Sequence, residues 1–433
     1  MTCALGIDFG TTKNAVIFYD GERPENSIAL SASHYAGFTD GTARQDFLKS
    51  AACVRDLIMQ LPEEKRNRIS AIGLTGQMHS VVLWNNDTCS PVTTWQDKTA
   101  SATGKLELYR AKSGCHLCDG FGAVTLAMMA EENQLSGWTA CGTPADRFAA
   151  LLCEKNDCAM DPTFAASWGI FDLQNGTWNR NAAGQLGIPF ELLPRIVPSG
   201  SCIGRTKGFV GLPDDIPVMA AFGDNQASIY GTSCDLQEEL FMTLGTGAQL
   251  SYLLRDDEEL PSGVEARPFL NGSILAVHAP LCGGRAWAWL AKSVNQMLSA
   301  LGLTEIPEKE LMDRLDQMAL NGNSNGLTVQ PHFLGERSDP TLRGTISGID
   351  LENFTLPALA TALGNGIIHT LAAGIPDECR KRRKTIVGSG NGLRLCQSLR
   401  SAAEQILQLP VVFREVKEEA ATGAAKLALK MNL

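Results

Sequence analysis

The sequence predicts an α/β protein built from two similar halves. The chain opens with two apolar runs, residues 4–7 and 15–19, on either side of a Gly/Thr turn. The same pattern of strand, Gly/Thr turn and strand returns at residues 241–253, and strand and helix patterns alternate elsewhere. A supersecondary unit that occurs twice indicates a duplicated domain. The 433 residues are too many for one ordinary core and fit two domains of about 200 residues.

The opening turn, residues 6–12, carries one acid, Asp8, and two hydroxyl residues, Thr11 and Thr12, among glycines. Glycines let a backbone approach an anionic oxygen, amides and hydroxyls donate to phosphate, and a carboxylate holds a divalent cation through water. A ligand-free β-hairpin also uses Gly and Thr, so one copy leaves both interpretations open. The second copy, at Thr243 to Gly247, favours a pair of phosphate-binding turns and hence nucleotide phosphotransfer.

Helical spacing of apolar residues predicts a helix over residues 42–61, followed by a β-branched strand over 69–75 that ends before Gln77, Met78 and His79. Residues 80–84 continue that strand or pair with it. Ligands of α/β sheets lie at the carboxyl ends of strands, so residues 77–79 are placed where a ligand would bind. Residues 220–231 are typical of a strand end, an acid on a turn, Asp224, and a helix.

A polar connection at residues 232–240 predicts the domain boundary, with domains at 1–235 and 236–433. In the second domain we expect helices over 287–300, 307–320 and 356–373. A third glycine-rich turn, residues 386–392, comes before a helix that starts near Leu395.

Composition excludes several classes of function. A net charge of −10 and a pI near 5.2 argue against a nucleic-acid-binding surface, and the one dense basic run, residues 380–384, is interpreted as a solvated segment ahead of a strand. No run of 18 apolar residues and no signal-type start are found, so we expect a soluble, cytoplasmic protein without membrane contact.

The 13 cysteines are odd in number and irregular in spacing. Most, including Cys53, Cys153, Cys202 and Cys396, are interpreted as small core residues of a reducing compartment. Cys115 and Cys118 form a lone C-x-x-C, which is compatible with a zinc or redox site but more typical of idle thiols. The six histidines show no zinc-binding spacing, and we predict no transition-metal site.

Taken together, eight motifs in order resemble those of the FGGY carbohydrate kinases over nearly the whole chain: residues 6–12, 76–79, 95–97, 222–227, 243–247, 331–337, 343–348 and 388–390. The resemblance implies two ribonuclease-H-like domains, as in actin and hexokinase, with mixed sheets flanked by helices and an interdomain cleft. It also implies ATP and Mg²⁺ as cofactors and a small-molecule sugar as substrate. The sequence does not determine the oligomeric state, and a homodimer stays open.

The resemblance assigns Asp224 as the catalytic base, although an acid that caps a helix would give the same local pattern. Asp8 would organise Mg²⁺, with Asp224 as the second carboxylate, and loss of Asp8 should abolish turnover but leave sugar binding. Many relatives carry a cation where this chain has Ala15, and we expect Lys13 to reach the phosphates instead. The other residues implied to bind the nucleotide are Gly10, Thr11, Thr12, Gly245, Thr246, Gly388, Ser389, Gly390 and Asn391.

The residues implied to bind the sugar combine an aromatic face with hydrogen-bonding groups: Gln77, Met78, His79, Trp95, Asp97, Trp168, Asp224 and Asn225. His79 could equally be a structural histidine and Trp95 a core residue, and a ligand role of Asp161 stays open. Residues 94–97, 120–123, 165–171 and 178–179 are similar to the sedoheptulokinase branch. We therefore expect sedoheptulose as the phosphate acceptor, with xylulose as the alternative. A further alternative is a non-catalytic protein of the same fold that senses sugar or nucleotide by binding it.

Overall fold

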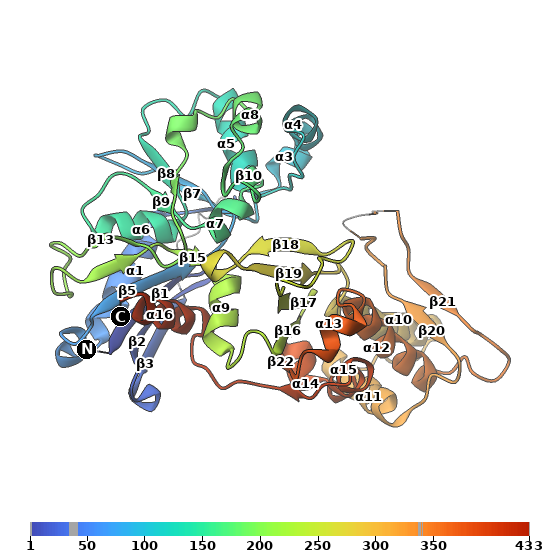
Figure 1. Cartoon of the computed structure of the whole chain (residues 1–433). Coiled ribbons are helices and arrows are strands. Elements are labelled where there is room, and N and C mark those ends of the chain that lie inside the picture. Colours follow the sequence, from blue (N-terminus) through green and yellow to red (C-terminus); the bar gives the residue numbers. More distant parts are fainter. Residues whose placement is uncertain (1, 34–41, 337–338, 340, 433) are drawn as a thin grey trace. The chain divides into compact units, whose positions relative to one another are not determined.

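The chain forms two compact units in the computed structural model, which describes residues 2–33, 42–336, 339 and 341–432 (Figure 1). The first unit contains the residues up to Thr232, the short segment Pro268–Ser273 and the residues from Val416 onward. The second contains Ser233–Arg267 and Ile274–Glu415. The last helix therefore belongs to the unit that the N-terminus begins. Among the described helices, none is both long and apolar enough to cross a membrane.

The first unit is built on a mixed sheet in the order β13-β14-β5-β1-β2-β3, with β15 also paired to β5. β1, β2 and β3 pair antiparallel, whereas β5 lies parallel to both β1 and β14. The bounds are β1 Cys3–Phe9, β2 Lys13–Asp20, β3 Ile28–Ser33, β5 Ala71–Gly76, β13 Cys202–Arg205, β14 Pro217–Met219 and β15 Phe222–Gly223.

The second unit repeats this arrangement in a sheet of order β18-β19-β17-β16-β22-β23. β16, β17 and β19 pair antiparallel, and β22 lies parallel to both β16 and β23. The duplication predicted from the two hairpins is thus confirmed in strand direction as well as in sequence. The bounds are β16 Glu239–Leu244, β17 Ala248–Leu253, β18 Glu265–Pro268, β19 Ile274–His278, β22 Thr385–Ser389 and β23 Val411–Val412.

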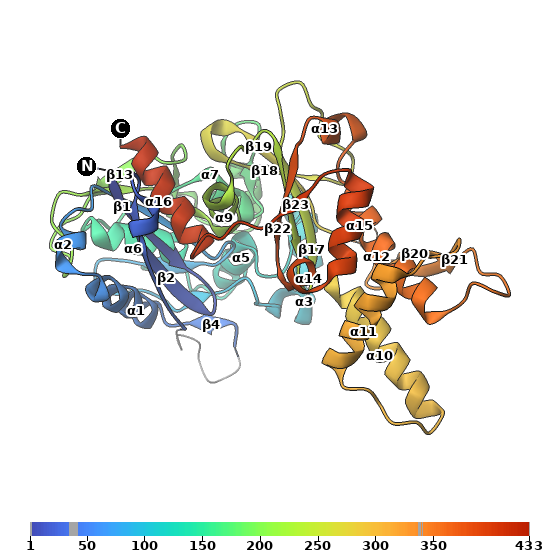
Figure 2. The same ribbon diagram turned by 90° about the horizontal axis from the view of Figure 1, so that it is seen from below.

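The main helices follow the same series in both halves of the sequence. The order is β1-β2-β3-α1-β5-α6-β14-α9 in the first half and β16-β17-β19-α12-β22-α15-β23-α16 in the second, with other elements inserted. In Figure 2, α12 and α15 lie together beside the strands of the second sheet, and α12 contacts α15 and β17. The bounds are α1 Phe47–Gln60, α6 Pro144–Leu152, α9 Asp224–Thr232, α12 Leu356–Ala372, α15 Gln397–Leu407 and α16 Glu419–Met431.

The inserted elements of the first unit are short. They are β4 Arg44–Gln45, α2 Glu63–Arg66, β6 Val82–Trp84, β7 Val92–Thr93, α3 Thr99–Ala102, α4 Lys105–Ser113, α5 Gly122–Glu131, β8 Ala140–Gly142, β9 Ala159–Met160, α7 Pro162–Ser167, β10 Phe171–Asp172, β11 Thr177–Trp178, α8 Arg180–Gln185 and β12 Arg195–Ile196. Those of the second unit are α10 Gly284–Ala300, α11 Glu308–Asn321, β20 Thr328–Gln330, β21 Thr345–Ser347, α13 Asp377–Lys381 and α14 Asn391–Leu395.

Several predicted elements differ in detail. The helix expected from residue 42 begins at Phe47, because the Asp46 carboxylate accepts from the backbone N–H groups of Leu48 and Lys49 and caps it there. Residues 80–84 neither continue β5 nor pair with it, since β6 pairs with β8. The third glycine-rich turn leads first into the short α14 at Asn391, and the helix expected near residue 395 is α15, which starts at Gln397.

Two interpretations of side chains were wrong. The basic run is not wholly solvated, because the Arg383 side chain is buried and donates to the buried Glu258 carboxylate at 2.7 and 3.0 Å. A buried charge needs such a partner. Cys202, predicted as a core residue, is exposed, and all 13 cysteines are free thiols.

The close approach of α16 to the first sheet and to α9 depends on glycines at the contacts (Figure 1). A Cβ atom at Gly6 on β1 would lie 1.9 Å from the Ala421 carbonyl oxygen, and one at Gly73 on β5 would lie 2.0 Å from that of Ala424. On α16 itself, a Cβ atom at Gly423 would lie 1.9 Å from the Ala227 carbonyl oxygen. These backbone contacts leave no room for a methyl group.

We predict that Gly423→Ala lowers the free energy of unfolding by about 2 kcal/mol, because α16 must move away from α9. Gly184→Ala is the matched control, since Gly184 is also helical and a Cβ atom there meets nothing within 4 Å. Urea unfolding of both variants measures the difference. Equal unfolding midpoints would contradict the packing described here.

Candidate active site

Asp8 and Asp224 lie at the carboxyl ends of strands on either side of β5. Asp8 is the sixth residue of β1, and Asp224 follows β15 directly as the first residue of α9. β5 pairs parallel with both strands, so that Thr75 is in register with Asp8 on one side and with Phe222 on the other. The Thr75 hydroxyl also donates to the Phe222 carbonyl at 2.7 Å. This ladder brings the two acids to one edge of the sheet.

Burial makes both carboxyls unusually weak acids. Burial, together with the nearby charges of Asp224 and Glu418, raises the pKa of Asp8 to about 7, although Lys13 opposes this increase. Burial also raises the pKa of Asp224 to about 6, opposed by the Asn225 N–H, which donates to Oδ1 at 2.8 Å. Acids whose pKa values are raised by burial are typical of catalytic sites.

The buried Oδ1 atom of Asp8 has no hydrogen-bond partner among the described residues. An orphaned carboxylate oxygen is where a hard cation would bind. No cluster of three or more His, Cys, Asp or Glu side chains suited to a metal ion occurs in the described part of the chain. A donor set of one or two carboxylates fits Mg²⁺, which is commonly held in this way together with water and substrate phosphate.

The turn after β1 is connected to the predicted sugar-binding residues. Thr11 accepts two hydrogen bonds, from Gln45 Nε2 to its carbonyl at 2.7 Å and from Trp95 Nε1 to its hydroxyl at 2.9 Å. Gln77 Nε2 donates to Gln45 Oε1 at 2.9 Å. Trp95 is 48% exposed, so the alternative that it is a core residue is wrong. Gln45, which joins the two groups, was not predicted from the sequence.

His79 is held in a single orientation by several contacts. Its backbone lies in the left-handed region (φ 68°), and its N–H donates to Ser167 Oγ at 3.0 Å. The imidazole Nδ1 is 2.5 Å from the Ser167 carbonyl, and the ring stacks on Phe121 with centroids 4.7 Å apart. Strained backbone held by surrounding contacts is more common at functional sites. Nearby, the Met78 side chain packs against Gly223, next to Asp224.

Other predicted sugar-binding residues are less accessible. Gln77 is almost completely buried and Trp168 exposes none of its surface, because the Trp168 ring packs against Gly122 and Trp178. Asp97 accepts from the Thr99 backbone N–H at 2.9 Å at the start of α3. Asn225 is partly buried beside Asp224. Among the predicted sugar-binding residues, Trp95 is exposed, the Met78 side chain packs next to the residue before Asp224, and Trp168 lies in the core.

Asp161, whose role was left open, contributes indirectly. It is buried at the N-terminus of α7, where it accepts from the Thr163 N–H at 2.6 Å, and burial raises its pKa to about 6. The Thr163 hydroxyl in turn accepts from the Gly223 N–H at 2.8 Å. Asp161 and Thr163 thus fix the strand end that carries Asp224.

In the second unit, three glycine-rich segments meet around the turn between β16 and β17. The Gly284 N–H donates to the Gly245 carbonyl at 2.9 Å, and a Cβ atom at Gly390 (φ 83°) would lie 2.5 Å from the Leu244 carbonyl oxygen. The hydroxyls of Thr243 and Ser389 are 2.8 Å apart. Thr246 and Asn391 are exposed beside them. The structure thus joins the second and third predicted turns into one backbone-rich surface suited to phosphate.

Gly283 and Gly284 were missed by the sequence analysis, although a Gly-Gly pair directly before an apolar helix was the available signal.

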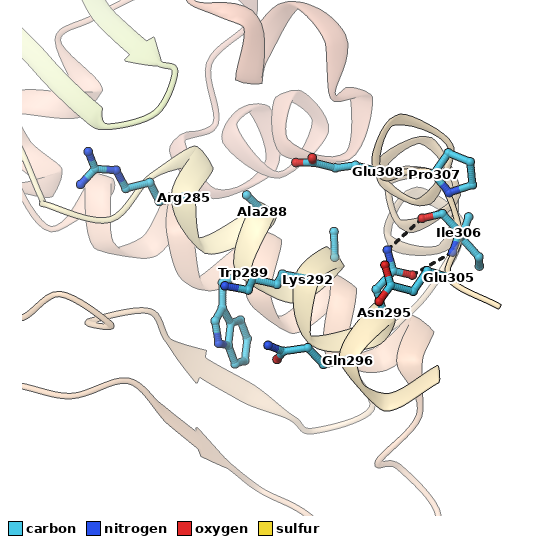
Figure 3. Close-up of a pocket in the computed structure, with 11 residues that line it drawn as sticks. Arg285, Ala288, Trp289, Lys292, Asn295, Gln296, Glu305, Ile306, Pro307 and Glu308 are labelled. Atoms are coloured by element: carbon cyan, nitrogen blue, oxygen red, sulfur yellow. Dashed lines mark hydrogen bonds between the residues drawn. The ribbon is translucent and has the colours of Figure 1, made fainter. Parts of the chain in front are cut away.

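A cavity of about 880 Å³ runs from Arg285 along α10 to the start of α11 (Figure 3). Trp289 and Lys292 line one wall of the cavity. Ile306 lies on the opposite wall, and the Asn295 side chain holds it there by donating to its carbonyl at 2.8 Å and accepting from its N–H at 3.0 Å. This cavity begins at the glycine-rich surface.

Comparison with known families identifies both halves of the chain. The N-terminal domain of the FGGY family of carbohydrate kinases matches residues 3–231, and the C-terminal domain of that family matches residues 240–431. Sedoheptulokinase from Homo sapiens is 28% identical over 99% of this chain and 98% of its own length. Apulose kinase from Pectobacterium atrosepticum is 26% identical over 99% of this chain and 89% of its own length.

Solved structures show the same fold. Xylulose kinase from Lactobacillus acidophilus has a TM-score of 0.77 at 22% identity and covers 100% of this chain and 89% of its own. Glycerol kinase from Plasmodium falciparum, solved with ADP, has a TM-score of 0.77 at 19% identity, with coverages of 100% and 90%. The predicted α/β class, with two actin- and hexokinase-like domains of mixed sheets flanked by helices, is confirmed.

The raised pKa of Asp8 predicts a pH-dependent stability. The pKa of Asp8 in the folded state, about 7, lies above the usual value of 3.8. Between pH 3.8 and 7 the unfolded chain therefore loses the Asp8 proton more readily than the folded protein does, so the free energy of unfolding falls as the pH rises through this range. In metal-free buffer, the free energy of unfolding of Asp8→Asn should exceed that of the native protein by about 4 kcal/mol at pH 8 and should nearly equal it at pH 4.

Urea unfolding at both pH values measures this effect. The control is Asp56→Asn, since the Asp56 side chain is 63% exposed and should show the same small difference at both. A pH-independent effect of Asp8→Asn would contradict the buried, ionisable site.

Proposed function

The chain belongs to the FGGY family of carbohydrate kinases, and we propose that it transfers the γ-phosphoryl group of ATP to the terminal hydroxyl of a ketose, preferentially sedoheptulose. The observation that carries this proposal is the pair of partly buried acids, Asp8 and Asp224, at strand ends on either side of β5 and beside a glycine turn. Phosphoryl transfer needs an acceptor, a base and a cation around one phosphorus atom, and this pair supplies the base and the cation ligand.

We assign Asp224 as the general base. Its carboxylate takes the proton of the terminal hydroxyl while the hydroxyl oxygen forms the new bond to phosphorus and ADP leaves with the electrons of the broken P–O bond. A pKa near 6 keeps Asp224 ionised at neutral pH yet basic enough to accept a proton. Asp8 would hold Mg²⁺, with Asp224 as second carboxylate, and that cation would neutralise charge on the phosphate oxygens.

In the first unit, Gly10, Thr11, Thr12 and Lys13 are assigned to phosphate binding through backbone amides, hydroxyls and the ammonium group. In the second unit, Gly245 and Thr246 form a glycine turn of the same kind and are assigned to phosphate for the same reason. The turn formed by Gly388, Ser389, Gly390 and Asn391 would lie beside the adenine or ribose. The joined glycine segments in the second unit, and the exposure of Thr12, Thr246 and Asn391, support these assignments.

The sugar would bind at Met78, His79, Trp95, Asp97 and Asn225, with Gln77 and Trp168 acting from within the core. The exposed Trp95 ring can cover the C–H face of a sugar, and it is tied to Thr11 of the phosphate turn. Sedoheptulose is favoured over xylulose because sedoheptulokinases from two mammals match at 28% identity over 99% of this chain. A binding sensor without chemistry is disfavoured by the intact acid pair.

An ADP-release assay with sedoheptulose, xylulose, ribulose, fructose and glycerol tests the reaction. We expect sugar-dependent ADP release with the highest kcat/KM for sedoheptulose, because the chain shares motifs with the sedoheptulokinase branch. If xylulose gives the highest kcat/KM, only the choice of substrate is wrong. If none of these sugars raises ADP release above the rate with ATP alone, the kinase proposal fails.

The role of Asp224 predicts a pH–rate profile. The carboxylate must be ionised to accept a proton. We therefore expect kcat/KM to rise with pH, to reach half of its maximum near pH 6 and to level off at higher pH. Asp224→Asn should lower kcat about a thousandfold, whereas Asp56→Asn, at an exposed acid of the same unit, should not change it. A variant at position 224 that keeps the native kcat would exclude the base.

A further inference from the structure

Glu418 occupies a position for which glutamate is a poor choice. It directly precedes α16, yet among the described residues its side chain makes no capping hydrogen bond to that helix. Its backbone is left-handed (φ 45°, ψ 67°), a conformation that Gly and Asn adopt far more easily. Neither helix capping nor backbone preference explains a glutamate here.

The Glu418 carboxylate instead contacts Lys13, which lies 405 residues earlier in the chain. Glu418 Oε2 accepts from Lys13 Nζ at 2.7 Å. The glutamate side chain is only 17% exposed, whereas that of Lys13 is 50% exposed. A half-exposed ion pair of this kind contributes little to stability, so stability is a weak reason for keeping it.

The pair lies beside the first phosphate turn. Lys13 directly follows Thr12 and is the first residue of β2, and both charges act on Asp8, whose pKa is lowered by Lys13 and raised by Glu418. A lysine side chain carries a compact charge on a flexible stem, and an anchored carboxylate restricts where that charge can go. The ammonium group has three donors, and the contact with Glu418 uses one of them.

We propose that Glu418 is a positioning residue for nucleotide binding, which holds the Lys13 ammonium at the first turn so that its remaining donors face the phosphates. The proposal rests on the proposed function, because it assumes that phosphate binds at this turn. Glu418 itself need not touch the nucleotide. The residue that precedes the last helix would then support the phosphate site through a single ion pair.

The decisive variant is Glu418→Asn, because asparagine caps helices well and tolerates the left-handed backbone but lacks the charge. We expect its melting temperature to equal or exceed that of the native protein, while the KM for ATP and the Kd for ADP rise about fivefold. The KM for sugar should stay unchanged. Glu154→Asn is the matched control, since Glu154 also has a left-handed backbone (φ 49°) and pairs with a lysine, Lys207, at 2.8 Å.

A double-mutant cycle shows whether Glu418 acts through Lys13. Lys13→Ala should raise the KM for ATP about tenfold, and adding Glu418→Asn should raise it no further. An unchanged ADP affinity in Glu418→Asn, or an additional loss in the double variant, would overturn the proposal. ADP binding by calorimetry needs no turnover, so it tests Glu418 even if the sugar assay were to show that the protein is not a kinase.

Discussion

The backbone contact between the last helix and the first sheet is the constraint on which the rest of this unit depends. α16 reaches β1 and β5 through Gly6 and Gly73, and its own Gly423 lets it lie against α9. Any side chain at these glycines would push the helix away by more than the interior can absorb. The same contact fixes the start of α9, where Asp224 lies, relative to β1, which carries Asp8. The geometry of the acid pair therefore depends on residues at both ends of the chain.

Burial of the two acids connects this packing to the chemistry. Away from water, each carboxyl holds its proton more tightly, and the charge of Asp224 adds to the effect at Asp8. One acid has an oxygen that no described residue hydrogen-bonds and that is suited to a cation. The other has the pKa of a base that works near neutral pH. Two residues of the same type thus acquire different roles from their surroundings, as the proposed phosphoryl transfer requires.

Local patterns predicted much of this fold, and long-range contacts account for what they missed. The Gly/Thr hairpins, the strand ahead of Gln77 and the acid at the start of α9 follow from residues close together in sequence, and the structure confirms these elements. The burial of Arg383 depends on Glu258, 125 residues away, and the burial of Trp168 on Gly122, so no local pattern reports either. Only folding brings Gln45 to Thr11.

The most direct test of the account is a ¹³C NMR titration of the aspartate carboxyl carbons, with Asp8 and Asp224 assigned through their Asn variants. The account predicts midpoints near 7 for Asp8 and near 6 for Asp224 in metal-free buffer, and a fall in the midpoint of Asp8 when Mg²⁺ and ADP are added. Midpoints of about 4 for both residues, the value of a solvated aspartate, would contradict it.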